Sequence, residues 1–463
     1  MNEIIYLVKN KNARNSILPY RYMVKSILQY FQLIIKHMWV FIIGKGQIMF
    51  KINIIGYNIF SPGGTTRSNL NLIAEFNAQN YVVVYYNYTD FDRFDLRRLH
   101  KHEKATANVQ IKKIGELYRQ TTEKNVEKEY FFITREDLFP LAAVIRKYNL
   151  KALIIGEVHT PLGLLNEHFA SVDLSPFTCL RVATPAIKKS FVQKYHFNRI
   201  YIQTVSLAHL QLCDPAQVQR NKTSNLLVYA RFDESAKDIT YAIKLTAYII
   251  NKLKKGNIRL YINGYGPDKA RYERMIAHNH LKNAVFINKK IPSDYIALST
   301  SHVETLGYAI AESLAQGHRV IAYVGDDHVT YENFSEVPLI NWLYKKDVAA
   351  DAQQVLKAIS ESMDKEELVK SMNILKEMKF GYVQKMFKNV SLFAGNGSLA
   401  DEKLENIESE TKQQIEKVLG ASHAPWYLKM YRHSRRVPGL RKLLQQPKLC
   451  EWLKSLRKSK KIE

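Results

Sequence analysis

The chain has 463 residues, of which 46% are hydrophobic and 24% are charged. This composition is typical of a globular protein and excludes a largely disordered one, while the length exceeds that of one ordinary core. The three cysteines, Cys179, Cys213 and Cys450, lie far apart without the spacing of a metal or redox motif, as is typical in a reducing cytosol. We therefore expect two domains with extensions.

The net charge of +25 is concentrated at the two ends of the chain. Residues 1–48 carry seven Lys and Arg against one Glu, and residues 426–463 carry twelve against two Glu. Because leucines and aromatic residues are interleaved with these cations, we expect the ends to bind an anionic membrane surface. Docking of the tail onto the body of the protein is the alternative. The sequence has no nucleic-acid-binding motif, so nucleic acid is not expected as a partner.

The N-terminal extension contains an apolar stretch at residues 26–44. Lys36 and His37 lie in the middle of this stretch, where polar and charged groups are costly in a bilayer. An interfacial helix is therefore favoured over a spanning one, and the late start of the stretch argues against a signal peptide. A functional chain beginning at Met49 is a third reading, since the next residues already have the pattern of a strand.

From residue 50 onward, apolar runs typical of buried parallel strands alternate with helical segments. A glycine-containing loop at 61–67 joins the first strand to a helix at 68–77. This arrangement lets a phosphate approach the backbone, so Gly63 and Gly64 are candidate binding residues. The strongly charged stretch 95–128 is expected to be helical. Strands are expected at 50–56, 81–86, 130–133, 152–155, 181–183 and 200–205.

A polar segment at 208–224, which includes Pro215, is expected to link this half to a second one. The second half has expected strands at 226–230, 259–262, 284–287, 295–301 and 319–323, and expected helices at 238–254, 269–279 and 346–380. Repeated β-α units on both sides of a linker predict an α/β protein with two Rossmann-like domains facing a cleft. The predicted divisions are 1–48, 49–207, 208–224, 225–395 and a helical basic tail at 396–463.

The stretch from Glu304 to Glu312 follows the strand at 295–301 and predicts a turn at Gly307 that opens a helix. The free N–H groups and positive dipole end of such a helix favour a phosphate. Glu312 lies about 7.5 Å further along the helix axis, where it could accept hydrogen bonds from sugar hydroxyls of the same ligand. Acids near a helix N-terminus also occur simply because they stabilise the dipole.

Two other motifs predict different chemistry. Asp90 and Asp92 form an Asp-x-Asp after a strand, a pattern in which paired carboxylates can hold a divalent ion against a diphosphate. That reading leaves the second half of the chain unexplained, so we favour a solvated loop. Gly264 and Gly266 lack the third glycine and the strand-end acid of a nicotinamide-binding motif.

Four features occur in one order along the chain: the Gly63-Gly64 loop with Arg67, the pair Arg231 and Lys237, the Gly264-x-Gly266 loop, and Glu304-x7-Glu312 followed by Gly317. This ordered set resembles the retaining glycosyltransferases of family 4, which have the two-domain GT-B fold. The resemblance extends over residues 49–395 and is strongest over 226–327. Within the family, the chain looks most like enzymes that glycosylate bacterial wall polymers or build capsular polysaccharides.

The resemblance implies a role for each matching residue. Arg231 and Lys237 would bind the donor diphosphate, because two fixed cations neutralise its developing charge without a metal ion. Glu304 would orient the donor sugar and Glu312 would hold the ribose hydroxyls. His159 would bond a hydroxyl near the anomeric carbon. The alternatives are a core histidine for His159 and a surface ion pair for Arg231. The other matches would contact the donor: Gly63, Gly64, Gly264, Gly266, Gly307, Tyr308 and Ala309.

The implied activity is a metal-independent hexosyltransferase, without a cofactor, that moves a sugar from a nucleoside-diphosphate sugar to a cell-envelope polymer, glycolipid or glycan acceptor. We expect it in the cytoplasm at the inner face of the cell membrane, as a monomer or a homo-oligomer. A catalytically silent glycosyltransferase-like subunit is the alternative, although the joint presence of Arg231, Lys237, Glu304 and Glu312 favours an enzyme. The segment 288–294 is shorter than the family's loop and short helix beside the base pocket, so the base pocket is expected to differ.

Overall fold

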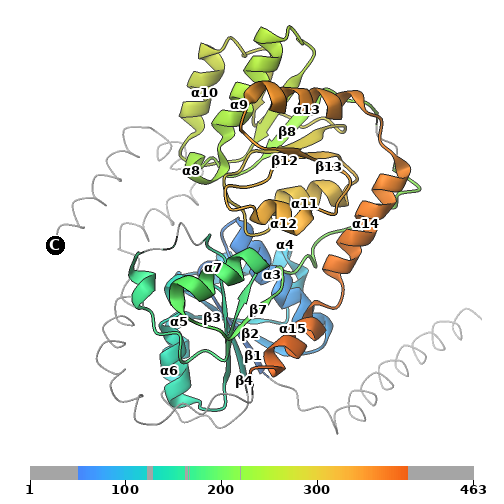
Figure 1. Ribbon diagram of the computed structural model, residues 1–463. Coiled ribbons are helices and arrows are strands. Elements are labelled where there is room, and N and C mark those ends of the chain that lie inside the picture. Colours follow the sequence, from blue (N-terminus) through green and yellow to red (C-terminus); the bar gives the residue numbers. More distant parts are fainter. Residues whose placement is uncertain (1–50, 122–128, 162–164, 166, 219–220, 395–463) are drawn as a thin grey trace, which may run out of the picture. The chain divides into compact units, whose positions relative to one another are not determined.

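The computed structural model describes residues 51–121, 129–161, 165, 167–218 and 221–394 (Figure 1). The predicted N-terminal extension with its interfacial helix and the predicted basic tail lie outside these residues. None of the helices in the described ranges combines the length and the apolar character that crossing a bilayer requires.

The first described sheet has seven strands in the order β3-β2-β1-β4-β5-β6-β7, and every neighbouring pair is parallel. Central strands of such a sheet are buried on both faces, which is why their sequences are continuous apolar runs. The strands are β1 (Lys51–Gly56), β2 (Val82–Asn87), β3 (Gln110–Lys113), β4 (Glu129–Ile133), β5 (Leu153–Glu157), β6 (Cys179–Val182) and β7 (Ile200–Ile202).

Helices cover both faces of this sheet, and alternate residues of one strand show which face is which. In β4, Phe131 and Ile133 belong to a core that includes residues of the helices α5, α6 and α7. Phe132 instead packs against Phe76 of α3. The described helices of this part are α3 (Gly64–Ala78), α4 (Arg93–His102), α5 (Ile114–Thr121), α6 (Leu141–Tyr148) and α7 (Pro185–Tyr195).

The expectation of a continuous helical stretch at 95–128 is wrong. The helix α4 ends at His102, and the segment then forms strand β3 before α5 begins at Ile114. β3 is an edge strand of sequence QIKK whose residues are exposed or half-buried. Because an edge strand pairs on one side only, it tolerates charged side chains and lacks the apolar run that marks the inner strands.

The second sheet has six described strands, again all parallel, in the order β10-β9-β8-β11-β12-β13. They are β8 (Asn225–Tyr229), β9 (Arg259–Asn263), β10 (Val285–Ile287), β11 (Ile296–Ser299), β12 (Val320–Tyr323) and β13 (Ile340–Leu343). One face packs against α9, α10 and α13, and the other against α11 and α14. These helices are α9 (Ile239–Ala247), α10 (Lys269–His278), α11 (Tyr308–Ala315), α13 (Val348–Ser360) and α14 (Lys365–Lys379), with α8 (Glu234–Lys237) and α12 (Val329–Phe334) beside them.

The expected helix at 238–254 and the expected helices within 346–380 are present. The first comprises α9 and a π-helical turn at Tyr248–Lys252, and the others are α13 and α14. The last described helix, α15 (Tyr382–Ser391), packs on the first sheet, since the ring of Phe387 contacts those of Phe76, Tyr81 and Tyr130 (Figure 1). The chain thus returns to its first half before residue 394.

Both sheets reverse their strand order beside their first strand, between β1 and β4 in one and between β8 and β11 in the other. At such a point, the connections leaving two neighbouring strands turn to opposite faces of the sheet and open a crevice beyond the carboxyl ends. The loops after β1, β8 and β11 start at these crevices, so the topology alone selects them for ligand binding.

Substitution of Gly264 by Ala is expected to destabilise the second sheet. An added Cβ atom would lie 1.8 Å from the carbonyl oxygen of Ala230, a distance that the backbone can relieve only by moving. We expect a loss of about 1–3 kcal/mol, visible as a lower thermal midpoint. The matched control is Gly256→Ala, where a Cβ atom meets nothing within 4 Å and the midpoint should stay unchanged. Equal midpoints for both variants would contradict the packing argument.

Candidate active site

A cleft of about 980 Å³ lies beyond the carboxyl ends of strands of both sheets. The predicted residues that line this cleft are Gly63, Gly64, Arg67, His159, Arg231, Lys237, Gly264, Glu304, Gly307, Tyr308, Ala309 and Glu312. The structure therefore brings together residues that are up to 249 positions apart in the sequence (312 − 63). Gly266 is not among the residues that line the cleft.

Two helices begin at this cleft without a side-chain cap. α3 starts after Gly63 and α11 after Gly307, and neither helix has an acidic residue in its first turn. In α11 the first bonded N–H groups are those of Ile310 and Ala311, which reach the carbonyl oxygen of Gly307. The N–H groups of Tyr308 and Ala309 precede this turn, so they are the ones that an anion can accept from.

The glycines of the first loop leave open space. A Cβ atom at Gly63 would meet nothing within 4 Å, and one at Gly64 would come no closer than 3.9 Å to the ring of Tyr308. Packing within the protein therefore does not require glycine at either position, although the backbone of Gly63, with φ = 156°, favours glycine by its conformation. The absence of side chains instead leaves the N-terminus of α3 uncovered, as close approach of a ligand to the backbone needs.

Gly264 and Gly266 serve the protein's own packing. The loop that they form runs against the segment after β8, where the Phe232 N–H donates to the Tyr265 carbonyl at 2.8 Å. A Cβ atom at Gly266 would lie 2.3 Å from the Phe232 carbonyl oxygen, and the Gly264 N–H already donates to Asn288 Oδ1 at 2.9 Å. These two glycines hold the loop that carries Arg231. Gly264 also lines the cleft, so a contact with the donor stays a prediction.

The predicted cations each have an acidic partner. Arg231, with 60% of its side chain exposed, bonds the carboxylate of Asp233. Lys237, at the end of α8, bonds the carboxylate of Glu304, and both of these side chains are about one-fifth exposed. The exposed pair of Arg231 and Asp233 contributes little to stability. Either of its two side chains can therefore exchange its partner for a ligand.

Glu312 lies in the fifth position of α11 and pairs with a residue that sequence reasoning missed. Its Oε1 atom is 3.1 Å from Nε2 of His209, whose Nδ1 is 2.9 Å from the side-chain amide nitrogen of Asn71. Because the amide nitrogen can only donate, Nδ1 accepts and the Nε2 proton points to Glu312. The carboxylate of Glu312 is therefore oriented before any ligand arrives, and 37% of it stays exposed.

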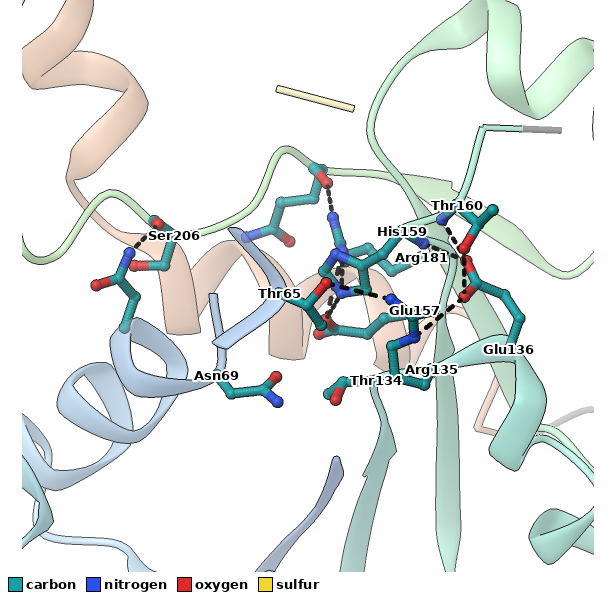
Figure 2. Close-up of polar contacts among 12 residues, drawn as sticks. Thr65, Asn69, Thr134, Arg135, Glu136, Glu157, His159, Thr160, Arg181 and Ser206 are labelled. Carbon is teal, nitrogen blue, oxygen red and sulfur yellow. Dashed lines mark hydrogen bonds and ion pairs between the residues drawn. The ribbon is translucent and has the colours of Figure 1, made fainter. Parts of the chain in front are cut away.

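His159 follows β5 and belongs to a group of four residues that we call the His159 cluster: Glu136, Glu157, His159 and Arg181 (Figure 2). Its Nε2 atom is 2.7 Å from Glu157 Oε2 and 3.1 Å from Arg181 Nη2. Glu136 accepts the backbone N–H groups of His159 and Thr160, each at 2.5 Å. The imidazole is only 5% exposed, so the cluster fixes it at the wall of the cleft.

The cluster contains an ion pair in the protein interior. Glu157 and Arg181 are 2% and 1% exposed, face each other across β5 and β6, and bond at 3.3 Å. Burial alone would raise the pKa of the Glu157 carboxyl, but the positive charge of Arg181 and the hydrogen bond from His159 outweigh it and lower the pKa to about 2. Glu157 is therefore a carboxylate at any physiological pH.

Sequence reasoning identified His159 but missed Glu136 and Arg181 as its supports. A signal was present, because an acid and a base inside the apolar strands at 153–157 and 179–182 need each other when they are buried. Their pairing depends on β5 and β6 being neighbours, which the sequence alone did not establish.

The Asp-x-Asp motif has a local structural role. Asp92 caps α4 by accepting the N–H groups of Phe94 and Asp95, and Asp95 returns a bond to the Asp92 N–H. Asp90 pairs with Lys113 at 3.1 Å. Across the described ranges, no three His, Cys, Asp or Glu side chains are grouped so that they could hold a metal ion.

The segment between β10 and β11 contains no helix in the described structure, as its short length predicts. Its Asn288 has φ = 53° and bonds both the N–H and the carbonyl of Gly264. This segment is therefore a turn that is tied to the glycine loop.

Comparison with known proteins agrees with this arrangement. A family model described as glycosyl transferases group 1 matches residues 214–374, which include Lys237, Glu304 and Glu312. No curated protein matches the sequence at a significant level.

The fold matches that of solved glycosyltransferases. A variant of TarM from S. aureus, in complex with fondaparinux, alpha-GlcNAc-glycerol and UDP, is 12% identical, with a TM-score of 0.57 over 75% of this chain and 100% of that one. A glycosyltransferase from Rickettsia africae is 12% identical, with a TM-score of 0.54 over 76% and 100%. The pneumococcal O-GlcNAc transferase GtfA, with UDP and GlcNAc, is 13% identical, with a TM-score of 0.50 over 75% and 99%.

The chain is a glycosyltransferase with the GT-B fold. The family match, over residues 214–374, covers part of the linker and all six strands of the second sheet, and the structural likeness extends over both sheets. The predicted fold, with two Rossmann-like domains facing a cleft, is confirmed.

Removal of the Arg181 charge should destabilise the glycosyltransferase strongly, because it leaves the Glu157 carboxylate buried without a counter-charge. We expect Arg181→Met to lose about 3–5 kcal/mol in urea unfolding at neutral pH. The pKa of Glu157 is lower in the folded chain than its ordinary value of 4.5. Its contribution to stability is therefore present above that value and is lost as the pH falls toward about 2.

The control for this experiment is Arg98→Met, because Arg98 is 63% exposed and pairs with Asp95 at 3.6 Å on the surface. Its removal should change stability by at most about 1 kcal/mol. If Arg181→Met behaved like this surface variant, the buried pair would have no role in holding the first domain.

Proposed function

We propose that this glycosyltransferase moves a hexose from a nucleoside-diphosphate sugar to a hydroxyl of a cell-envelope polymer, glycolipid or glycan. The observation that carries the proposal is the group around the N-terminus of α11. The N–H groups of Tyr308 and Ala309, which have no acceptor among the described residues, lie around one end of a helix with the cation Lys237 and the two acids Glu304 and Glu312, in one cleft. The N–H groups and Lys237 can donate hydrogen bonds to an anion, and the two carboxylates beside them can accept hydrogen bonds from hydroxyl groups. This combination matches a ligand with a diphosphate between two sugars.

The donor would bind mainly to the second domain. Its diphosphate would accept from the N–H groups of Tyr308 and Ala309 and from Arg231 and Lys237. Glu312 would accept from the ribose hydroxyls, which replace the contact with His209. Two of the similar structures contain UDP, so a uridine donor is the first choice for experiment.

We further propose that transfer needs no metal ion and retains the anomeric configuration. The acceptor oxygen attacks the anomeric carbon on the side that the diphosphate leaves, the C–O bond to the phosphate breaks, and the acceptor proton passes to a phosphate oxygen. Arg231 and Lys237 neutralise the charge that develops on the leaving group. The resemblance to retaining family 4 enzymes supports this stereochemistry, and the anomeric coupling constant of the product tests it.

We propose that the enzyme works at the inner face of the cell membrane, where lipid-linked or polymeric acceptors are assembled. The charges of +6 and +10 at the two ends of the chain, calculated from the Lys, Arg and Glu of 1–48 and 426–463, support this location. We expect the full chain to co-sediment with anionic vesicles but not with neutral ones.

A nucleotide sugar should raise the thermal midpoint of the protein, and Glu312→Ala should weaken this effect. Loss of a carboxylate that accepts from ribose hydroxyls removes about 1.5–3 kcal/mol of binding, or about 10- to 100-fold in affinity. The measurement is a thermal-shift titration with a panel of UDP-sugars, first without added metal. Glu273→Ala is the control, because Glu273 is an exposed acid of α10 that does not line the cleft.

The panel also separates the enzyme from a catalytically silent subunit. An enzyme should hydrolyse the stabilising donor slowly, and Glu312→Ala should lose both effects. A folded protein that responds to none of the nucleotide sugars, with or without a divalent metal, would support the silent subunit instead.

Lys237→Ala should lower the turnover number at saturating donor by about 100-fold or more, because the cation acts on charge that appears in the transition state. Lys244→Ala is the matched control, since this exposed lysine of α9 is not among the residues that line the cleft. Steady-state kinetics, with the donor that the thermal-shift panel identifies, measures the turnover number and the KM of the donor. An effect of Lys237→Ala on donor affinity alone would refute the proposed role in leaving-group stabilisation.

A further inference from the structure

The His159 cluster holds its histidine from two directions. The carboxylate of Glu136 binds the backbone N–H groups of His159 and Thr160 and the Thr160 hydroxyl, which fixes the chain after β5 (Figure 2). The carboxylate of Glu157 binds the ring itself at Nε2. A histidine that filled core space would need only one partner for its polar edge, and this one is held at both its backbone and its ring.

The position of the ring proton follows from the partners of Nε2. Glu157 is ionised, so its Oε2 atom can only accept, and Nε2 must carry the proton that bridges the 2.7 Å between them. Arg181 Nη2 is only a donor and reaches the same carboxylate oxygen at 3.3 Å. Arg181 Nη2 also lies 3.1 Å from Nε2 itself, but the 2.7 Å contact of Nε2 with the carboxylate is shorter and needs a proton between its two atoms. Both donors therefore converge on one carboxylate oxygen.

The other ring nitrogen, Nδ1, lies on the side of the cleft. Among the described residues, no group bonds Nδ1, and Nδ1 is not one of the buried polar atoms left without a partner. Since His159 lines the cleft, the small exposed part of its side chain includes this nitrogen. An imidazole whose only proton is on Nε2 has Nδ1 as an acceptor.

Arg181 keeps the carboxylate in place. Its Nη1 atom donates to the Gln203 carbonyl at 2.9 Å while Nη2 holds Glu157, so the guanidinium links strands β5 and β6 to the chain after β7. A buried carboxylate without this cation would take up a proton as its pKa rose. A protonated Glu157 could donate to the ring and reverse the hydrogen bond.

We propose that Glu157, held by Arg181, is a positioning residue that fixes His159 with its proton on Nε2, so that Nδ1 accepts a hydrogen bond from a sugar hydroxyl in the cleft. The cluster then selects a ligand that offers a hydroxyl donor at this point, and it disfavours a deoxy sugar or one that offers only an acceptor there. This inference rests on the proposed function for the identity of the ligand, but the orientation of the ring does not depend on it.

The ring proton is directly measurable. Nitrogen-15 NMR of protein labelled at histidine distinguishes a protonated from an unprotonated ring nitrogen, and His159→Gln assigns the signals. We expect the full chain without ligand to have the His159 proton on Nε2 at neutral pH. Glu157→Gln should shift this signature toward a mixture of forms and lower the turnover number about tenfold or more, with a smaller change in the KM of the donor.

Two further variants keep the test decisive. Glu157→Asp retains the buried charge, so it should fold, while its shorter side chain draws the carboxylate away from Nε2 and should reproduce the change in the NMR signature. Glu129→Gln is the matched control, because Glu129 is a buried carboxylate of β4 that pairs with Lys51 at 2.8 Å and does not line the cleft. It should leave both the signature and the turnover number unchanged.

The possible results separate this inference from the proposed function. A His159 proton on Nδ1 in the parent protein, or a Glu157→Gln variant that loses activity with an unchanged signature, would overturn the inference. A proton on Nε2 that Glu157→Gln and Glu157→Asp both disturb would support it, even if no nucleotide sugar were turned over. If the NMR results held but no nucleotide sugar were turned over, the proposed function would be refuted while the inference about the ring proton would stand.

Discussion

The parallel pairing of every described strand with its neighbours is the constraint on which the site depends. In a parallel sheet all carboxyl ends lie along one edge, and each following helix begins there with its unbonded N–H groups. Both sheets of this chain reverse their strand order at such an edge, so α3 and α11 start at one cleft. The positive character of the cleft is thus a property of the backbone, and side chains then decide what it binds.

The polar side chains of the cleft are arranged in pairs. Arg231 with Asp233 and Lys237 with Glu304 are pairs of opposite charge, His209 donates a hydrogen bond to Glu312, and all of these side chains keep some exposure to solvent. The ligand of the proposed function would therefore exchange partners with these groups and would not enter a field of unpaired charge. Such exchange is least costly at the exposed Arg231, whose ion pair contributes little to stability.

The pair of Glu157 and Arg181 differs from these exposed pairs, because it cannot exchange its partners with a ligand. Because both side chains are almost fully buried, either charge alone would be strongly destabilising, and the two cannot exchange for a ligand. This permanence makes the pair suitable for holding His159 in one orientation. The wall of the cleft formed by the first domain is therefore fixed, whereas the wall formed by the second domain is made of partners that a ligand replaces.

The sequence by itself determined the inner strands, the alternation of β and α units, and the turn at Gly307 between Glu304 and Glu312. These features are local, because apolar runs, glycine positions and short spacings already contain the physics of burial and helix termini. It did not determine the edge strand β3, which has no apolar run because half of it faces solvent. Only the tertiary structure decided that Gly264 and Gly266 serve packing, that His209 orients Glu312, and that Glu136, Glu157 and Arg181 surround His159. Each of these contacts joins residues on different strands or loops, and their partners become neighbours only once the order of strands in the sheet is set.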